Sequence, residues 1–262
     1  MPEPLRFTAL PLLLAGLMSV IPAVGGAEEE NSFKRELSEE EIEARVGRIG
    51  EAEETPKDFR LSRAESLLWR SDHLGNIDRP TRLYYEFIKS GTYEEGFTDA
   101  VYLDIVRINE DGTRNAVLDF FTAGRKQKIN PDNVTNITGN PVLGIYMQGD
   151  VYEMNRLTDG HWRHFQKQIK ITLRNSAQVE PVTFEFKGRQ YAGERIVFTP
   201  YVKDPHRRDF EQFAGKRYEF IFSEEIPGML YQIRTIVPGG KESTDKPLME
   251  ETLTLVEANF GD

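Results

Sequence analysis

The sequence predicts an α+β fold: one antiparallel, strongly curved, half-barrel-like sheet of about eight strands, with helices covering its concave side. Two observations predict this class. Residues 82–122 and 182–256 alternate apolar and polar side chains, as half-buried strands do. Residues 140–175, between these blocks, instead repeat their apolar side chains every three or four positions, which is typical of helices.

Residues 1–27 are expected to be a secretory signal peptide that is cleaved near Ala27. A weakly basic start with Arg6 precedes an apolar stretch, Phe7–Val24, and small residues follow it. The chain has no cysteine, which in an exported protein of this size favours a bacterial periplasm over a eukaryotic secretory route. We therefore expect a periplasmic, soluble protein that contacts the membrane only through the uncleaved signal.

Residues 28–56 are predicted to form an acidic leader with one short helix. They hold eleven acidic and four basic residues, which accounts for −7 of the chain's net charge of −10. The capping-box pattern Ser38–Glu41 starts the helix and Gly50 ends it. Residues 57–262 are expected to be a single α+β domain, and their lack of a dominant basic patch argues against a nucleic-acid partner.

The first elements of the domain are a helix and three strands. Ser62 and Glu65 repeat the capping-box pattern, so a helix should run to about His73, with Gly75 as its stop. Its buried side is expected to be Leu67, Leu68 and Trp69. Alternating patterns then predict strands at Leu83–Ile88, Ala100–Ile108 and Asn115–Thr122.

Asp111 and Gly112 are the strongest short hairpin signal in the chain. A two-residue turn there would place Leu103 opposite Phe120 in the core. On the other face it would place Asp104 directly opposite Asp119. Two facing carboxylates can raise one another's proton affinity or hold a cation, so this pair is the candidate for a hydrolase or a metal site. The other interpretation is a solvated sheet face.

The central block predicts two helices. Asn140 is a good cap, and Pro141 suits the first helical position. The second helix should be amphipathic, with a basic outer face that contacts either water or an anionic partner. The apolar positions of the two helices are Leu143, Met147, Val151 and Met154, then Trp162, Phe165, Ile169 and Leu173; the basic positions are Arg163, Lys167, Lys170 and Arg174.

His161 and His164 lie three residues apart in this block, a spacing that can ligate a metal. No third ligand is apparent, so a helix-terminal or packing role is the other interpretation. His73 and His206 have no assignable partner. No nucleophile elbow, phosphate loop or dinucleotide fingerprint occurs, so we assign no catalytic residue, metal or cofactor.

The last block predicts five more strands and a short helix. Aromatic side chains are frequent on these strands; they form either an ordinary core or an incompletely filled concave face that holds an apolar ligand. Pro227-Gly228 fits a type II turn. The elements are Val182–Phe186, Tyr191–Tyr201, a helix from Asp204 to Gly215, Tyr218–Phe222, Met229–Val237 and Met249–Val256.

This order of elements, Ser38–Gly50, Arg82–Thr122, Asn140–Asn175 and Val182–Val256, resembles the LolA/LppX-like half-barrel of bacterial periplasmic lipoprotein carriers. The resemblance lies in element order without a shared motif, so no functional residue is transferred. It implies a non-enzymatic binding or accessory protein for an apolar ligand or lipid. The alternatives are an envelope scaffold that binds a protein partner, and a hydrolase or metal binder that uses Asp104 and Asp119.

Overall fold

The computed structural model describes residues 60–126, 134–158, 160–239 and 246–260. Its helices are α2 (Arg63–Trp69), α3 (Pro141–Leu157), α4 (Trp162–Asn175) and the 3-10 helices η1 (Ala123–Arg125) and η3 (Arg207–Phe213). Its strands are β1 (Thr81–Gly91), β2 (Phe97–Ile108), β3 (Arg114–Phe120), β4 (Gln178–Phe186), β5 (Arg189–Phe198), β6 (Arg217–Phe222), β7 (Leu230–Val237) and β8 (Met249–Phe260). The predicted signal peptide and the leader helix lie outside the described residues.

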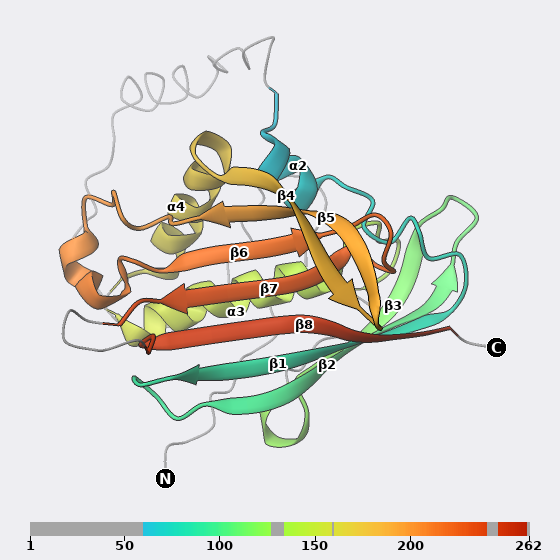
Figure 1. Ribbon diagram of the computed structural model, residues 1–262, viewed down its shortest axis with the longest axis horizontal. Coiled ribbons are helices and arrows are strands. Elements are labelled where there is room, and N and C mark those ends of the chain that lie inside the picture. Colours follow the sequence, from blue (N-terminus) through green and yellow to red (C-terminus); the bar gives the residue numbers. More distant parts are fainter. Residues whose placement is uncertain (1–59, 127–133, 159, 240–245, 261–262) are drawn as a thin grey trace, which may run out of the picture. The chain divides into compact units, whose positions relative to one another are not determined.

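The eight strands form one antiparallel sheet in the order β3-β2-β1-β8-β7-β6-β5-β4. Figure 1 shows α3 and α4 together behind this sheet, with α3 crossing behind β7 and β8. The predicted class, an α+β fold with a curved antiparallel sheet of about eight strands packed on helices, is confirmed. Strand β8 joins the two halves of the sheet, because it pairs with β1 on one side and with β7 on the other.

Helix α2 begins as predicted but ends early. Ser62 and Glu65 form the capping box, with hydrogen bonds of 3.1 and 3.0 Å between each side chain and the other residue's backbone N–H. The helix ends at Trp69 instead of His73, because the buried His73 side chain turns back to donate from Nε2 to the Leu67 carbonyl oxygen at 2.6 Å. Leu67 is buried as predicted, whereas Trp69 is 39% exposed, so its predicted burial is wrong.

The register of the β2–β3 hairpin differs from the prediction. Asn109 and Thr113 close a loop of three residues rather than two, and Gly112 adopts φ +82° in it. A bulge between Ile105 and Arg107 shifts the register once more. Because the two shifts add to an even number, the side chains of residues 101–105 and 116–120 keep their predicted faces of the sheet, whereas Arg107 and Ile108, between the bulge and the loop, exchange faces.

The second half of the sheet follows the prediction closely. Gly228 (φ +76°) completes the predicted turn, in which Met229 N–H donates to the Ile226 carbonyl at 3.1 Å. The tip of the β4–β5 hairpin folds over the sheet face that points away from α3 (Figure 1). There Lys187 forms an ion pair with Glu257 of β8 at 3.2 Å. The aromatic side chains divide accordingly: Phe198, Tyr218, Phe220 and Phe222 lie in the core, and Phe184, Phe186, Tyr191 and Tyr231 contact one another at this folded hairpin.

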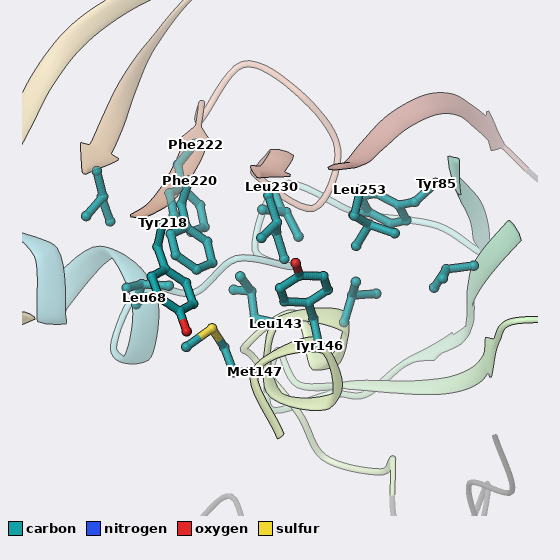
Figure 2. Packing of buried hydrophobic residues seen from close by; sticks show 14 of the residues in the cluster. Leu68, Tyr85, Leu143, Tyr146, Met147, Tyr218, Phe220, Phe222, Leu230 and Leu253 are labelled. Carbon is teal, nitrogen blue, oxygen red and sulfur yellow. The ribbon is translucent and has the colours of Figure 1, made fainter. Parts of the chain in front are cut away.

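The core lies between the sheet and α3. Figure 2 shows Leu143 and Tyr146 of α3 pointing toward Leu230 of β7 and Leu253 of β8. All four side chains are at most 4% exposed. Burying one such side chain contributes about 1.5–3 kcal/mol, so this contact is the main attachment of the first half of α3.

None of the helices in the described ranges has the length and apolar character needed to cross a membrane.

Candidate binding site beneath helix α3

The start of α3 is fixed to the sheet by its cap residue. The buried Asn140 side chain accepts from Val142 N–H at 3.1 Å, which is the predicted cap. Its amide nitrogen donates to Tyr85 Oη at 3.0 Å and to the Gly228 carbonyl at 3.1 Å. The Asn140 backbone N–H also donates to His73 Nδ1 at 3.1 Å. Burial lowers the pKa of His73, which keeps it in the neutral form that this bond requires.

The second half of α3 carries charged contacts with the sheet in addition to its buried apolar side chains, Val151 and Met154. Asp150 accepts from Lys216 Nζ at 2.5 Å and from Tyr218 Oη at 2.7 Å. One turn later Glu153 binds Lys89 of β1. Lys89 Nζ also lies 3.3 Å from Glu251 of β8. We call these residues the buried ionic cluster: Lys89, Asp150, Glu153, Lys216 and Glu251.

The positive and negative charges of the cluster belong to different elements of the structure. Burial, and then the charge of Glu153, raise the pKa of Glu251 to about 8, so Glu251 is mostly protonated at neutral pH. Burial opposes the ionised form of Glu153, but Lys216 and Lys89 outweigh it and leave the pKa of Glu153 below its usual value. Burial also lowers the pKa of Lys216, but Asp150 and Glu153 raise it by more. The sheet therefore carries two cations, and α3 carries both full anions.

Tyrosine hydroxyls complete the polar contacts. Tyr146 of α3 donates to Glu251 at 3.1 Å and lies 3.2 Å from Thr235 Oγ1. Tyr201 and Tyr218 share a hydrogen bond of 3.0 Å beside Asp150. Burial, the largest cause, raises the pKa of each of these three tyrosines well above its usual value, so they act as neutral donors.

The cluster reaches the surface at the end of α3. Glu94, in the β1–β2 loop, lies 3.4 Å from Lys89 and pairs with Arg156 through two hydrogen bonds of 2.7 and 2.8 Å. The neighbouring Tyr93 ring packs edge-on against the ring of Phe213 in η3, with 5.3 Å between the ring centroids. Two surface hollows of about 410 and 490 Å³ lie along η3, and the first also contacts the last residues of α3. Neither is lined by a residue of the inner sheet face, where the core side chains pack against α3.

The structure separates the two predicted site carboxylates. Asp104 lies opposite Val117, and Asp119 lies opposite Tyr102, so the predicted direct pair is wrong. Asp104 instead forms a two-bond ion pair with Arg82 at 2.6 and 2.7 Å. Asp119 pairs with Lys126 at 2.7 Å. The hydrolase or metal site that required these two carboxylates to face each other is therefore not supported.

The histidines have packing and capping roles in the described chain. His161 caps α4, since its Nδ1 accepts from Arg163 N–H at 3.2 Å. His164 Nε2 contacts the buried Asp204 at 2.7 Å, which ties α4 to the loop before η3. His206 lies edge-on to His164. No group of three or more His, Cys, Asp or Glu side chains suited to a metal occurs among the described residues.

The basic face of α4 is confirmed. Arg163, Lys167, Lys170 and Arg174 are exposed, while Phe165, Ile169 and Leu173 are buried. Arg174 binds Glu65 of α2 at 3.1 Å.

Sequence reasoning missed the buried ionic cluster, although part of its signal was present. Lys89 continues the core-facing alternation of Leu83, Tyr85 and Phe87. Glu251 likewise lies between the buried Met249 and Leu253. A charged residue on the apolar face of a strand requires a buried partner, and that rule would have selected both.

Comparisons with known proteins bear on the fold alone. No protein-family model matches the chain. No curated protein matches it either. Among solved structures, LprF from Mycobacterium bovis shows 12% identity over 73% of this chain and 91% of its own, with a TM-score of 0.25. The LolA superfamily protein NE2245 from Nitrosomonas europaea shows 9% identity over 76% and 94%, with a TM-score of 0.20. A putative outer membrane lipoprotein-sorting protein domain from Vibrio parahaemolyticus shows 8% identity over 70% and 85%, with a TM-score of 0.17.

Proposed function

We propose that this protein is a non-catalytic, periplasmic binding protein that takes an apolar ligand or lipid between its sheet and α3. Helix α3 acts as a lid in this proposal. The observation that carries it is the position of the buried ionic cluster, which pairs the second half of α3, and not its first half, with lysines of the sheet side.

The division matters because ion pairs and apolar contacts respond differently to opening. A buried ion pair gains little net stability, since each charge gives up its hydration. When the second half of α3 lifts, Lys89, Lys216 and Glu153 regain water, which offsets the lost pairing. Apolar side chains would be exposed from both halves, including Val151 and Met154 of the second, but the first half has no ion pair whose hydration offsets that cost. The lid should therefore open from its C-terminal end and hinge near Asn140.

The inner sheet face suits an apolar ligand. Away from the buried ionic cluster, it is continuous over β1, β8, β7 and β6 and consists of aromatic and branched aliphatic side chains. They are Tyr85, Phe87, Leu253, Leu255, Ile233, Phe220 and Phe222, each at most 3% exposed. Because α3 fills the space over this face, the proposal requires a lid that moves, rather than a preformed cavity.

A tether between Glu94 and Arg156 tests this function. The chain has no cysteine, so Glu94→Cys/Arg156→Cys introduces the only two thiols. A short bismaleimide would then fix the end of α3 to the β1–β2 loop. The control is the same variant with both thiols capped by N-ethylmaleimide. Binding of the fluorescent fatty acid cis-parinaric acid is measured by titration.

We expect the capped protein to bind the fatty acid and the tethered protein to bind it at least about tenfold more weakly. Equal binding by both proteins would reject α3 as the lid. If neither the wild type nor the capped protein binds, and native mass spectrometry of protein purified from a periplasm also finds no apolar ligand, the binding function itself is wrong.

A second candidate is an envelope scaffold that binds an acidic protein through α4. Lys167 and Lys170 are exposed on α4, and within the described ranges neither forms an ion pair. Lys167→Glu/Lys170→Glu should abolish co-purification of such a partner, with Lys203→Glu, an exposed change outside α4, as the control. Unchanged co-purification in the double variant would remove α4 as the contact.

A further inference from the structure

We propose that the ligand has an anionic head group, a carboxylate or a phosphate, which Lys89 and Lys216 bind in place of the α3 carboxylates. In the closed protein, Asp150 and Glu153 occupy the position of that head group. This inference rests on the proposed binding function and deepens it by naming the chemical class of the ligand.

The first support is the distribution of charge across the interface. Lys89 belongs to β1 and Lys216 directly precedes β6, so both cations stay with the sheet when α3 moves. Asp150 and Glu153 belong to α3 and leave with it. The lysine side chains are 7% and 2% exposed in the closed protein. A purely apolar ligand would leave the Lys216 ammonium buried without the carboxylate that pairs with it and Lys89 with only Glu251 and the partly exposed Glu94, which is costly.

The second support is the donor geometry at Asp150. Lys216 Nζ and Tyr218 Oη approach the two oxygens of this one carboxylate at 2.5 and 2.7 Å. Both donors belong to the same short segment, and the Tyr201 hydroxyl holds Tyr218 in place at 3.0 Å. A charged donor and a neutral donor that converge on one carboxylate form an oxyanion site. A carboxylate or phosphate of a ligand can satisfy the same two donors.

The third support comes from Glu251, the one acid of the cluster on the sheet. It accepts from Tyr146 of α3 at 3.1 Å and lies near Lys89 at 3.3 Å. In the closed protein, burial and the charge of Glu153 raise the pKa of Glu251 to about 8, so there it does not neutralise the lysines at neutral pH. Without α3, the cluster residues that stay with the sheet are two lysines and one acid, so they keep a positive charge even when Glu251 ionises.

The site also has a direction. Lys89 contacts Glu94, which lies in the β1–β2 loop at the surface. The apolar inner face extends from the cluster toward Leu230 and the Asn140 cap at the other end of α3. A head group at Lys89 would thus lie toward the surface end of α3, with Lys216 deeper in, and an apolar chain would follow the sheet inward. An amphiphile with one charged end matches this polarity.

The test compares two probes that have the same acyl chain and differ at the head group. cis-Parinaric acid carries a carboxylate, and its methyl ester has the same chain without the charge. We expect the wild-type full chain to bind the acid at least about tenfold more tightly than the ester at pH 7. Displacement of the acid by oleate and by oleoyl lysophosphatidate then shows whether the site prefers a carboxylate or a phosphate.

The deciding variant is Asp150→Asn/Lys216→Met, which removes the ion pair without changing the net charge. It should bind the ester as the wild type does and lose the preference for the acid. The matched control, Glu180→Gln/Arg195→Met, removes a more exposed ion pair of the β4–β5 hairpin and should keep the preference. Lys89→Met/Glu153→Gln repeats the test at the second lysine, and thermal melts verify that each variant is folded.

The outcomes separate the two proposals. If wild type binds acid and ester equally, or if both cluster variants keep the wild-type preference, the anionic head group is rejected while the binding function stands. If wild type binds neither probe nor either competitor, the binding function fails and this inference fails with it.

Discussion

Lys216 Nζ lies 2.5 Å from Asp150 Oδ1, and the two side chains are only 2% and 1% exposed. The pair joins the segment before β6 to the middle of α3, and Tyr218 donates to the second Asp150 oxygen. An ion pair this deeply buried is stable only while both charges are present. Its two members should therefore respond very differently to single and to double substitution.

We expect Asp150→Ala to lower the free energy of unfolding by about 3–5 kcal/mol, because it leaves the Lys216 ammonium buried without its hydrogen-bonded carboxylate. Asp150→Leu/Lys216→Met should cost far less, since apolar residues of similar volume need no hydration. Urea denaturation at pH 7 measures both. Glu180→Ala, in the partly exposed pair with Arg195, is the control and should cost less than about 1 kcal/mol. Equal losses for the single and the double variant would contradict this account.

Glu251 predicts a specific dependence of stability on pH. Its pKa is raised to about 8 in the folded protein, from an ordinary value of 4.5. The folded state thus binds the proton more tightly, and this contribution to stability is complete below about pH 4.5 and lost as the pH rises toward 8. The side chain of the Glu251→Gln variant cannot ionise. The free energy of unfolding of this variant should therefore rise, relative to that of the wild type, by roughly 1–3 kcal/mol between pH 5 and pH 9.

Urea denaturation of both proteins across this pH range measures the gain. The groups that face Glu251 are Lys89 of β1, Tyr146, Asp150 and Glu153 of α3, and Lys216 before β6. Glu250→Gln, on the opposite face of the same strand, corrects for the change in net charge. A difference between wild type and Glu251→Gln that stays constant with pH would show that Glu251 is ionised throughout.

Local sequence rules predicted most of the fold, because capping, turn and alternation signals act within a few residues. The Asn140 cap and the Gly228 turn were found for that reason. The Asp104–Asp119 pair failed because its register depends on a third loop residue and a bulge, which leave the alternation unchanged. Lys89 and Glu251 carried a local signal, but the pairing of Lys216 with Asp150 joins residues far apart in the chain, and no short-range pattern predicts it.

Two glycines offer the same chemical change with opposite expected effects. In Gly149→Ala, the new methyl group on α3 would meet nothing within 4 Å, and alanine favours the helix. We expect stability to rise by about 0.5–1 kcal/mol. In Gly228→Ala, the methyl group would lie 2.6 Å from Leu83 Cδ1 at φ +76°, so stability should fall by at least about 1 kcal/mol. Thermal melts of both variants check the signs, and a loss in Gly149→Ala would mean that α3 is not a regular, exposed helix at that point.

Native-state hydrogen exchange should reveal the opening of α3 directly. Amides of residues 150–157 are expected to exchange with a lower opening free energy than those of 142–147, because part of the contacts of the second half are ion pairs whose charges regain water on opening. The Glu94→Cys/Arg156→Cys tether should remove this difference by slowing exchange in residues 150–157, whereas the thiol-capped control should keep it. The amides of both halves of α3 could instead show the same opening free energy as those of the central strands, as in one global unfolding. In that case α3 does not open separately, and the lid mechanism is excluded.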